Sequence, residues 1–298
     1  MRFVNADGRA GLLVDGSVFD VEELSGGAIG SDARSAVVDY WDGLVSLAMR
    51  GAASGGAPVG SVRLGPPVPT PPMVLSVVAN FPPAERPAFP MVVGKSPTSV
   101  VGPGDDIVLP DPTRLPLRQA WVIPEPELGI VTRAGGRHLH AADAASSIAG
   151  FVVAQDVTER RHELGPSPGP SSWTWSDLPA KTLGKSFDTF CPTGPALVTL
   201  DELPDPGALL KRCWINDRLV FEHSTADMLW SAVELVALIS SFVTLPAGLL
   251  CLAGCGGTVD GSPIPFLAAG DEVRTEIEGI GTMVNTCVAE SPRPSRAG

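Results

Sequence analysis

The sequence has few cysteines, a single tyrosine and no cluster of basic residues. Its 298 residues include five cysteines, and acidic side chains outnumber basic ones by 33 to 21. The cysteines are widely spread and form no CxxC pair, which excludes a disulfide framework or zinc site and predicts free, buried thiols. A nucleic-acid interface needs a clustered basic face, so the acidic balance argues against a nucleic-acid partner.

A long apolar leader is also missing from the start of the sequence. MRFVNADGRAGLLVDG contains no extended apolar run, so we expect no signal peptide. Residues 235–259 lack charge and are long enough to span a membrane, but Pro246 and Gly248 divide them. We therefore expect a core helix followed by a buried strand there, no membrane partner, and a cytoplasmic location.

Apolar residues make up 44% of the chain and charged residues only 18%, which is ample material for a buried core. The 33 glycines and 30 prolines favour short strands joined by many turns over a helical bundle. We expect residues 1–67 to form a small N-terminal domain with a helix over 35–49, and residues 68–290 to form the main domain. The tail 291–298 is predicted to be disordered.

Apolar runs and turn residues predict the elements of the main domain. Asn216 and Asp217 indicate the turn of a hairpin over 213–221. Ser224 and Asp227 are typical of a helix N-terminus, so we expect a helix from there to about Leu245. The remaining elements are strands at 74–80, 120–132, 150–156, 271–278 and 282–288, and a helix at 142–148.

Two glutamates lie two residues apart in a predicted strand. Residues i and i+2 of a strand point to the same face, so Glu125 and Glu127 would project side by side, about 7 Å apart. Such close carboxylates repel each other unless a cation neutralises them, and Mg²⁺ or Mn²⁺ prefers oxygen ligands. The alternative is a solvated acidic face on an edge strand, which Pro126 would tolerate.

Two further segments carry residues suited to a pocket. Asp156 ends an apolar strand, where it would either face a pocket or cap the following segment. The loop 184–195 offers Lys185, which can move a proton or hold an oxyanion when it is buried near a metal. The alternative for Lys185 is an ordinary solvated loop lysine.

Together these segments, from about Val74 to Val288, resemble the fumarylacetoacetate hydrolase family. Each single motif is weak, but all of them occur in the family's order. They are Lys95, GPGD at 102–105, Glu125-Pro-Glu127, Asp156-Val-Thr-Glu-Arg160, Lys185-Ser-Phe-Asp-Thr-Phe190, Pro192-Thr-Gly-Pro195, Ser224-Thr-Ala-Asp-Met228 and the closing segment from Gly270 to Asn285.

The resemblance implies a fold of the α+β class that is mainly β, a mixed β-sandwich roll with a small N-terminal α/β domain, usually as a homodimer. It implies that Glu125, Glu127 and Asp156 bind Mg²⁺ or Mn²⁺, and that the substrate is a 2-oxo acid or β-dicarbonyl compound that reacts through a metal-bound enolate. Lys185 is then the catalytic candidate.

The resemblance also implies which residues meet the substrate. Arg160 would hold a substrate carboxylate, although an ion pair with Glu159 or Glu163 is the alternative. Lys95, Phe81 and Cys255 are the other substrate-binding candidates.

The sequence departs from the family at the water-activating His–Glu dyad. The two positions of that dyad hold Ala84 and Pro87, which cannot take a proton from water. Cys255 replaces a threonine that normally touches substrate, and either packs there or alters substrate preference, because a thiol is a weaker donor. Glu163 stands where the family often has glutamine, and would add a catalytic base or merely a charge.

Three functions follow from these observations. We rank tautomerase, decarboxylase or dehydratase chemistry through an enolate first, because the metal ligands and Lys185 are retained without the dyad. Hydrolysis of a C–C bond in an acylpyruvate-like substrate ranks second, with Glu163 or Glu85 replacing the dyad. A catalytically inactive, ligand-binding homologue ranks third.

Overall fold

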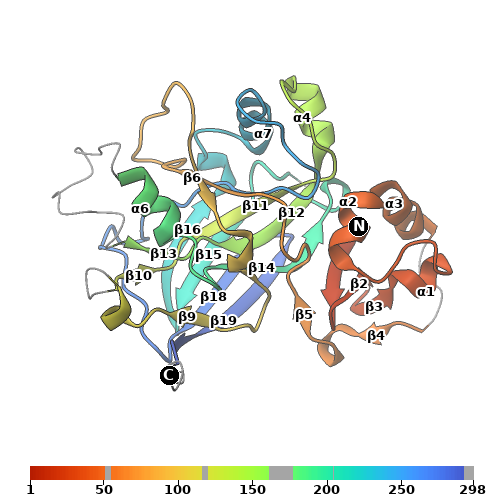
Figure 1. The fold of residues 1–298 in the computed structure, drawn as a ribbon, viewed down its shortest axis with the longest axis horizontal. Helices are drawn as coiled ribbons and strands as arrows, with labels where there is room; N and C mark the ends of the chain where they lie inside the picture. The colour runs from red at the N-terminus through yellow and green to blue at the C-terminus, as the bar shows by residue number, and fades with distance from the viewer. Residues whose placement is uncertain (51–54, 116–119, 161–176, 204, 292–298) are drawn as a thin grey trace, which may run out of the picture.

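The computed structural model describes residues 1–50, 55–115, 120–160, 177–203 and 205–291, and of residues 177–180 it describes the backbone alone. Strands of two large sheets make up most of the main domain, and the helices lie at their edges and ends (Figure 1). This arrangement confirms the predicted mainly β fold of the α+β class.

A twelve-stranded mixed sheet forms the centre of the molecule. Its strand order is β4-β3-β2-β1-β14-β12-β11-β17-β6-β7, with β5 paired to β1 and β8 paired to β14. The bounds are β1 (Arg2–Ala6), β2 (Arg9–Val14), β3 (Ser17–Asp20), β4 (Ala57–Pro58), β5 (Leu64–Gly65), β6 (Val74–Val78), β7 (Met91–Lys95), β8 (Val100–Val101), β11 (Pro126–Thr132), β12 (Ile148–Gln155), β14 (Cys191–Val198) and β17 (Leu250–Leu252).

A second sheet of five strands has the order β16-β15-β18-β19-β9, and a two-stranded ribbon joins β10 to β13. The bounds are β9 (Ile107–Leu109), β10 (Val122–Ile123), β13 (Thr158–Glu159), β15 (Leu210–Ile215), β16 (Arg218–Ser224), β18 (Glu272–Ile277) and β19 (Gly281–Ala289). The predicted hairpin is confirmed, with Asn216 at a positive φ of 55° in its turn. The strand predicted at 271–278 is also confirmed as β18, in which Val273, Thr275 and Ile277 are buried.

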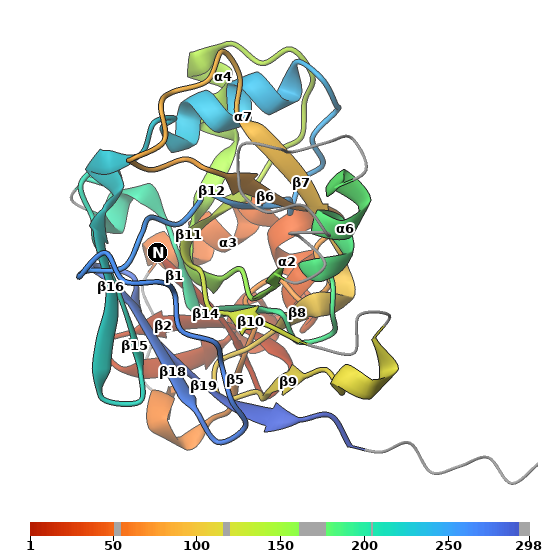
Figure 2. The same ribbon diagram turned by 90° about the vertical axis from the view of Figure 1, so that its left-hand side faces the viewer.

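The helices are α1 (Val21–Ser25), α2 (Ala33–Asp39), α3 (Trp41–Arg50), α4 (Ala141–Ser147), α6 (Asp177–Gly184) and α7 (Ala232–Ser240), with 3₁₀ turns η1 (Val59–Ser61), η2 (Pro97–Ser99), η3 (Pro112–Arg114), η5 (Leu200–Glu202) and η6 (Thr225–Asp227). Helices α4 and α7 lie side by side at one end of the large sheet (Figures 1 and 2).

Two helix predictions need correction. The single helix over 35–49 is two helices, since the backbone of Tyr40 leaves the helical region between α2 and α3 (φ −127°, ψ 24°). The helix expected from Ser224 begins only at Ala232. Ser224 caps the 3₁₀ turn η6 instead, and Ser231 caps α7, each with a capping box.

The N-terminal part continues the main sheet. Strand β1 pairs antiparallel with β14, with Arg2 opposite Val198 and Phe3 opposite Leu197 (Figure 2). One apolar cluster contains Leu12, Val37 and Leu44 of the N-terminal part together with residues of β11, β12, β14 and β17. Strand β1 and this shared cluster join residues 1–67 to the rest of the chain.

The uncharged stretch 235–259 begins within α7 and contains the buried strand β17, as expected. Among the residues that the structure describes, no helix combines the length and apolar character needed to cross a membrane. The predicted tail lies outside the described residues, apart from Ser291.

Candidate metal centre

Antiparallel pairing of β11 with β12 gathers the three predicted carboxylates. Pro126 at the start of β11 lies opposite Gln155 at the end of β12, so the residues just beyond these ends become neighbours. The N–H of Asp156 donates to the carbonyl of Glu125 at 2.8 Å. Carboxylate oxygens of Glu125, Glu127 and Asp156 lie within 4.8 Å of one another. Glu125 precedes the strand rather than lying in it, yet its carboxylate still converges with the other two.

The three carboxylates differ in burial. Glu127 is 2% exposed and Asp156 is fully buried, whereas Glu125 remains partly exposed. Burial, followed by the negative charge of Asp156, raises the pKa of Glu127 well above its usual range. For Asp156 burial acts in the same direction, but the ammonium groups of Lys185 and Lys95 outweigh it and lower its pKa to about 2. One side of the centre is therefore neutralised by lysines and the other is not.

Lys185 lies between the carboxylates. Its Nζ donates to Glu125 Oε2 at 2.7 Å, to Asp156 Oδ2 at 2.5 Å and to Thr158 Oγ1 at 2.8 Å. The side chain is only 3% exposed, and Lys185 is the first residue after α6. The structure thus brings the catalytic candidate into contact with two of the three candidate metal ligands.

Lys95, predicted to bind substrate, lies behind the carboxylates instead. Its Nζ donates to Asp156 Oδ1 at 2.8 Å and to the carbonyl oxygens of Val157 and Lys185. The side chain is completely buried, and the predicted role of Lys95 in substrate binding stays a prediction. In this position Lys95 orients Asp156.

The donor set suits a hard divalent cation. Within the described part of the chain, Glu125 Oε1 and Glu127 Oε1 accept no hydrogen bond, while the other oxygen of each carboxylate is held by a protein donor. Oxygen ligands at mutual distances below 4.8 Å fit Mg²⁺ or Mn²⁺. The residues present therefore fit the implied metal.

Sequence reasoning missed three groups that position these carboxylates. Ser76 of β6 donates to Asp156 Oδ2 at 2.5 Å, Thr158 donates to Glu125 Oε2 at 2.8 Å, and the N–H of Gly254 donates to Glu127 Oε2 at 2.5 Å. Gly254 has a positive φ of 96°, and a Cβ there would approach Asn80 Cβ to 2.7 Å. Its glycine-only backbone is what turns the N–H toward Glu127.

Sequence reasoning also missed Lys211, which lies on the buried face of β15. Its side chain is buried, its Nζ donates to the carbonyl of Gly254 at 3.0 Å, and it lies 4.5 Å from the centroid of the Phe81 ring. Burial lowers the pKa of Lys211. Phe81, one of the substrate-binding candidates, is therefore buried, and its ring lies against the ammonium group of Lys211.

Cys255 follows Gly254 and is partly exposed. Its Sγ donates to the carbonyl of Gly256 at 3.3 Å, and burial raises the pKa of the thiol well above its usual value. His223 Nε2 hydrogen-bonds the carbonyl of Gly257 at 2.6 Å, and burial lowers the pKa of the imidazole. His223 therefore holds the loop after Gly254.

The structure says less about the roles of the remaining candidates, which are Arg160, Glu163 and Glu85. Arg160 is half-buried and its N–H donates to the carbonyl of Trp121 at 2.9 Å, so its predicted role in carboxylate binding stays a prediction. Glu163 lies outside the described residues. Glu85, the alternative base for hydrolysis, is exposed on the loop between β6 and β7.

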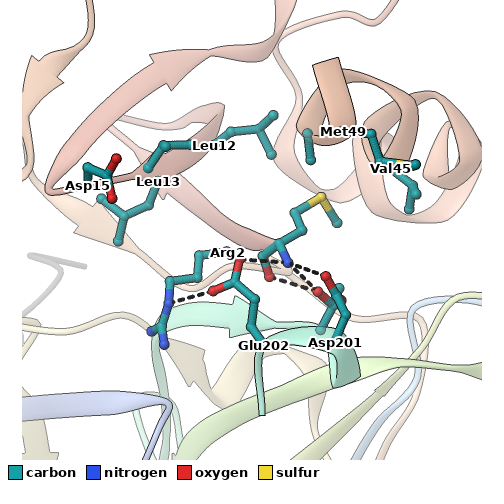
Figure 3. A pocket seen from close by; sticks show the side chains of 12 residues that line it. Arg2, Leu12, Leu13, Asp15, Val45, Met49, Asp201 and Glu202 are labelled. Atoms are coloured by element: carbon teal, nitrogen blue, oxygen red, sulfur yellow. Dashed lines mark hydrogen bonds and ion pairs between the residues drawn. The ribbon is translucent and has the colours of Figure 1, made fainter. Parts of the chain in front are cut away.

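Figure 3 shows a separate pocket at the N-terminal part of the chain. It has a volume of about 630 Å³ and is lined by β2, α3 and η5, with Leu12, Val45 and Met49 on its apolar side. Arg2 Nε pairs with Glu202 Oε2 at 3.0 Å on its polar side. None of the three clustered carboxylates lines it, so the metal centre is a different site.

A comparison with protein families shows to which family this chain, with its fold and carboxylate cluster, belongs. The model of the fumarylacetoacetate (FAA) hydrolase C-terminal domain matches residues 74–288, the span expected from the motifs. The chain belongs to the fumarylacetoacetate hydrolase family. The carboxylate cluster, Lys185 and Lys95 all lie within the matched residues.

Individual relatives are enzymes of several reaction classes. The mitochondrial oxaloacetate tautomerase FAHD2A of Homo sapiens is 38% identical over 204 residues, which are 68% of this chain and 60% of the human protein. The match thus leaves about two fifths of that curated relative uncovered.

Two solved structures share the fold over nearly the whole chain. The fumarylacetoacetate hydrolase of Exiguobacterium antarcticum has a TM-score of 0.76 at 26% identity, covering 97% of this chain and all of the other. Maleylpyruvate hydrolase of Sphingobium sp. SYK-6, in complex with manganese(II) and pyruvate, has a TM-score of 0.77 at 24% identity, covering 98% and 100%. The family fold expected from the sequence is confirmed.

Proposed function

We propose that this family member is a Mg²⁺- or Mn²⁺-dependent enzyme that interconverts the keto and enol forms of a 2-oxo acid, through the substrate's enolate. The observation that carries the proposal is the contact of Lys185 with Glu125 and Asp156, inside a cluster of three carboxylates. A cation held there supplies a Lewis acid that stabilises negative charge on a chelating 2-oxo acid. The oxaloacetate tautomerases among the relatives support this reaction class.

The residues of the chain have separate roles in this proposal. Ser76 and Lys95 fix Asp156, Thr158 fixes Glu125, and the N–H of Gly254 fixes Glu127, so the carboxylates keep one orientation. Lys185 is the group that moves a proton to or from the carbon beside the oxo group, or holds the oxyanion. A tautomerisation needs no attacking water, which agrees with Ala84 and Pro87 at the dyad positions.

The test follows the enol absorbance of oxaloacetate with purified protein in Mg²⁺ or Mn²⁺, with and without a chelator. Metal-dependent ketonisation without release of a second acid supports the proposal, and Lys185→Met should remove at least about 10²-fold of the rate. Release of two acids from an acylpyruvate panel would instead support the hydrolase alternative. If none of these compounds were turned over and elemental analysis detected no metal, the remaining alternative would be a catalytically inactive, ligand-binding homologue.

Three further predictions accompany the proposal. The chain is a homodimer, as the family resemblance implies, and it is cytoplasmic. Residues 1–67 and 68–290 are its two domains. Light scattering of the purified protein tests the oligomeric state.

A further inference from the structure

Lys95, Lys185 and Lys211 are buried close to the carboxylates or the residues that hold them, and among the described residues Lys211 contacts no carboxylate. Lys185 and Lys95 contact carboxylates directly. Lys211, which is 1% exposed, forms no ion pair with any described residue, and its single hydrogen bond goes to the carbonyl of Gly254. An ammonium group carries three donors, and a buried charge is costly unless it is paired. Lys211 therefore has unused capacity to bind an anion.

The surroundings of Lys211 favour a bound anion over a structural role. The Phe81 ring lies against one side of its Nζ, and the neighbouring Cys255 thiol stays protonated because its pKa is raised. Neither group neutralises the ammonium. Replacing such a buried charge by an apolar side chain is commonly neutral or stabilising, so stability alone does not explain a lysine here.

Gly254 connects Lys211 to the metal centre. Its N–H donates to Glu127 at 2.5 Å and its carbonyl accepts from Lys211 at 3.0 Å. The ammonium and the carboxylate are thus separated by one residue, which spans about 3.5 Å, and two hydrogen bonds. Cys255 beside them is partly exposed to solvent.

The charges of the centre point to a dianion. A cation in the carboxylate cluster and the ammonium of Lys211, on the other side of Gly254, form two positive centres. A ligand with two carboxylates matches both, with one carboxylate toward the cation site and the other toward Lys211.

We propose that Lys211 determines substrate specificity by binding the second carboxylate of a short dicarboxylic 2-oxo acid. This inference rests on the proposed function, which places the 2-oxo acid end of the substrate at the cation site. Lys211 contacts the far end of the substrate, while Lys185 acts at the reacting carbons.

The turnover test compares oxaloacetate with 2-oxobutanoate, which has a methyl group in place of the second carboxylate. Lys211→Met should lower the ratio of kcat/KM for oxaloacetate to that for 2-oxobutanoate by about 10- to 100-fold, the value of a buried charge-assisted hydrogen bond. Arg212→Met is the matched control, because Arg212 lies on the outward face of the same strand and pairs with Glu222. An unchanged ratio in Lys211→Met would overturn the proposal.

A binding test separates this proposal from the proposed function. Malate and 2-hydroxybutanoate are unreactive 2-hydroxy acids that differ by the same carboxylate, and calorimetry measures their binding to Mn²⁺-loaded protein. Wild type should prefer malate, and Lys211→Met should lose the preference while still binding Mn²⁺. If this result were obtained but oxaloacetate were not turned over, the proposed reaction would be rejected and the role of Lys211 would be kept. Equal malate affinity in both proteins, or no binding of either acid, would reject the role of Lys211.

Folding of the variant is checked independently. Lys211→Met should melt no lower than wild type, because it removes an unpaired buried charge. Lys211→Gln, which keeps a hydrogen-bond donor for Gly254, should lose the malate preference to a similar extent. A preference retained in Lys211→Gln would show that the positive charge is not what binds the acid.

Discussion

Glu127 and Asp156 are both buried, yet their pKa values shift in opposite directions. Among the described residues, two lysines contact Asp156 and hold it ionised, whereas Glu127 accepts a hydrogen bond only from the N–H of Gly254 and faces the charge of Asp156. Glu127 is thus the ligand that gains most from a cation. Its substitution should affect metal binding more than it affects the folded structure.

Replacement of Glu127 by Gln should abolish stabilisation by Mn²⁺. At 100 times the dissociation constant, a metal that binds only the folded state adds about 2.7 kcal/mol to the free energy of unfolding of wild type. The variant should gain almost nothing, because a neutral amide replaces a charged ligand. Urea unfolding with and without Mn²⁺ measures both gains, and the exposed Glu22→Gln serves as control. An equal gain in Glu127→Gln would disprove the assignment of this ligand.

The five thiols should be unreactive in the native protein. Burial raises the pKa of Cys191, Cys213, Cys251 and Cys287 to about 12, and it raises the pKa of Cys255 well above the usual value of a thiol. The thiolate is the reactive form, so at pH 8 almost no thiolate exists until the chain unfolds. Titration with a chromogenic disulfide should detect no fast-reacting thiol in buffer and all five in urea. A rapid single thiol in buffer would indicate that Cys255 is activated.

At the residue scale, motif order predicted the carboxylate cluster and Lys185, because those residues lie in segments with a recognisable pattern. Lys211 and Ser76 lie in strands without such a pattern. A usable signal was present for Lys211, since it alternates with Cys213 and Ile215 and therefore shares their inward face. Ser76 gave no signal, because its role depends on the pairing of distant strands.

Two capping boxes follow each other before α7, and the sequence does not show which one begins the helix. Ser224 with Asp227 caps only η6, and the backbone then extends at Met228 (φ −62°, ψ 132°). Asn80 accounts for this path, because its side chain accepts the N–H of Trp230 and donates to the Trp230 carbonyl. A tertiary contact thus decides the start of the helix. The local pattern correctly predicted the hairpin and most strands, but the strand expected at 120–132 is divided into β10 and β11.

Loss of the second cap should destabilise the fold measurably. Ser231→Ala removes the acceptor for the N–H of Glu234 and should cost about 1 kcal/mol. Equilibrium urea unfolding at constant m-value gives the difference. Ser46→Ala is the control, because its hydroxyl only donates back to a helical carbonyl on an exposed face. A larger loss in the control than in Ser231→Ala would contradict the capping role.

At the scale of the whole molecule, the N-terminal part shares both a sheet and an apolar cluster with the main domain. The cluster places Leu44 of α3 with Val152, Leu197 and Leu252. Two parts that share a buried apolar cluster are expected to unfold cooperatively, because unfolding of one part exposes the apolar residues of the other. The predicted boundary near residue 67 is therefore crossed by stabilising contacts.

Calorimetry should show one cooperative unfolding transition for the entire chain. Leu44→Ala, which opens a cavity in the shared cluster, should cost about 2–5 kcal/mol and shift that single transition downward. Met49→Ala provides a comparison, because Met49 is 84% exposed. Two resolved transitions, with only the first one shifted in Leu44→Ala, would show that the two parts unfold independently.

The residues around Glu127 and Asp156 come from distant parts of the chain, and this has a consequence for the order of folding. Ser76 and Asp156 are separated by 80 positions, and Gly254 and Glu127 by 127. Contacts of such separation form late, because long loops must close first. Metal affinity should therefore emerge only in the slowest refolding phase, after the secondary structure. Stopped-flow refolding that followed both ellipticity and Mn²⁺ uptake would reveal this delay, and simultaneous appearance of the two signals would argue against it.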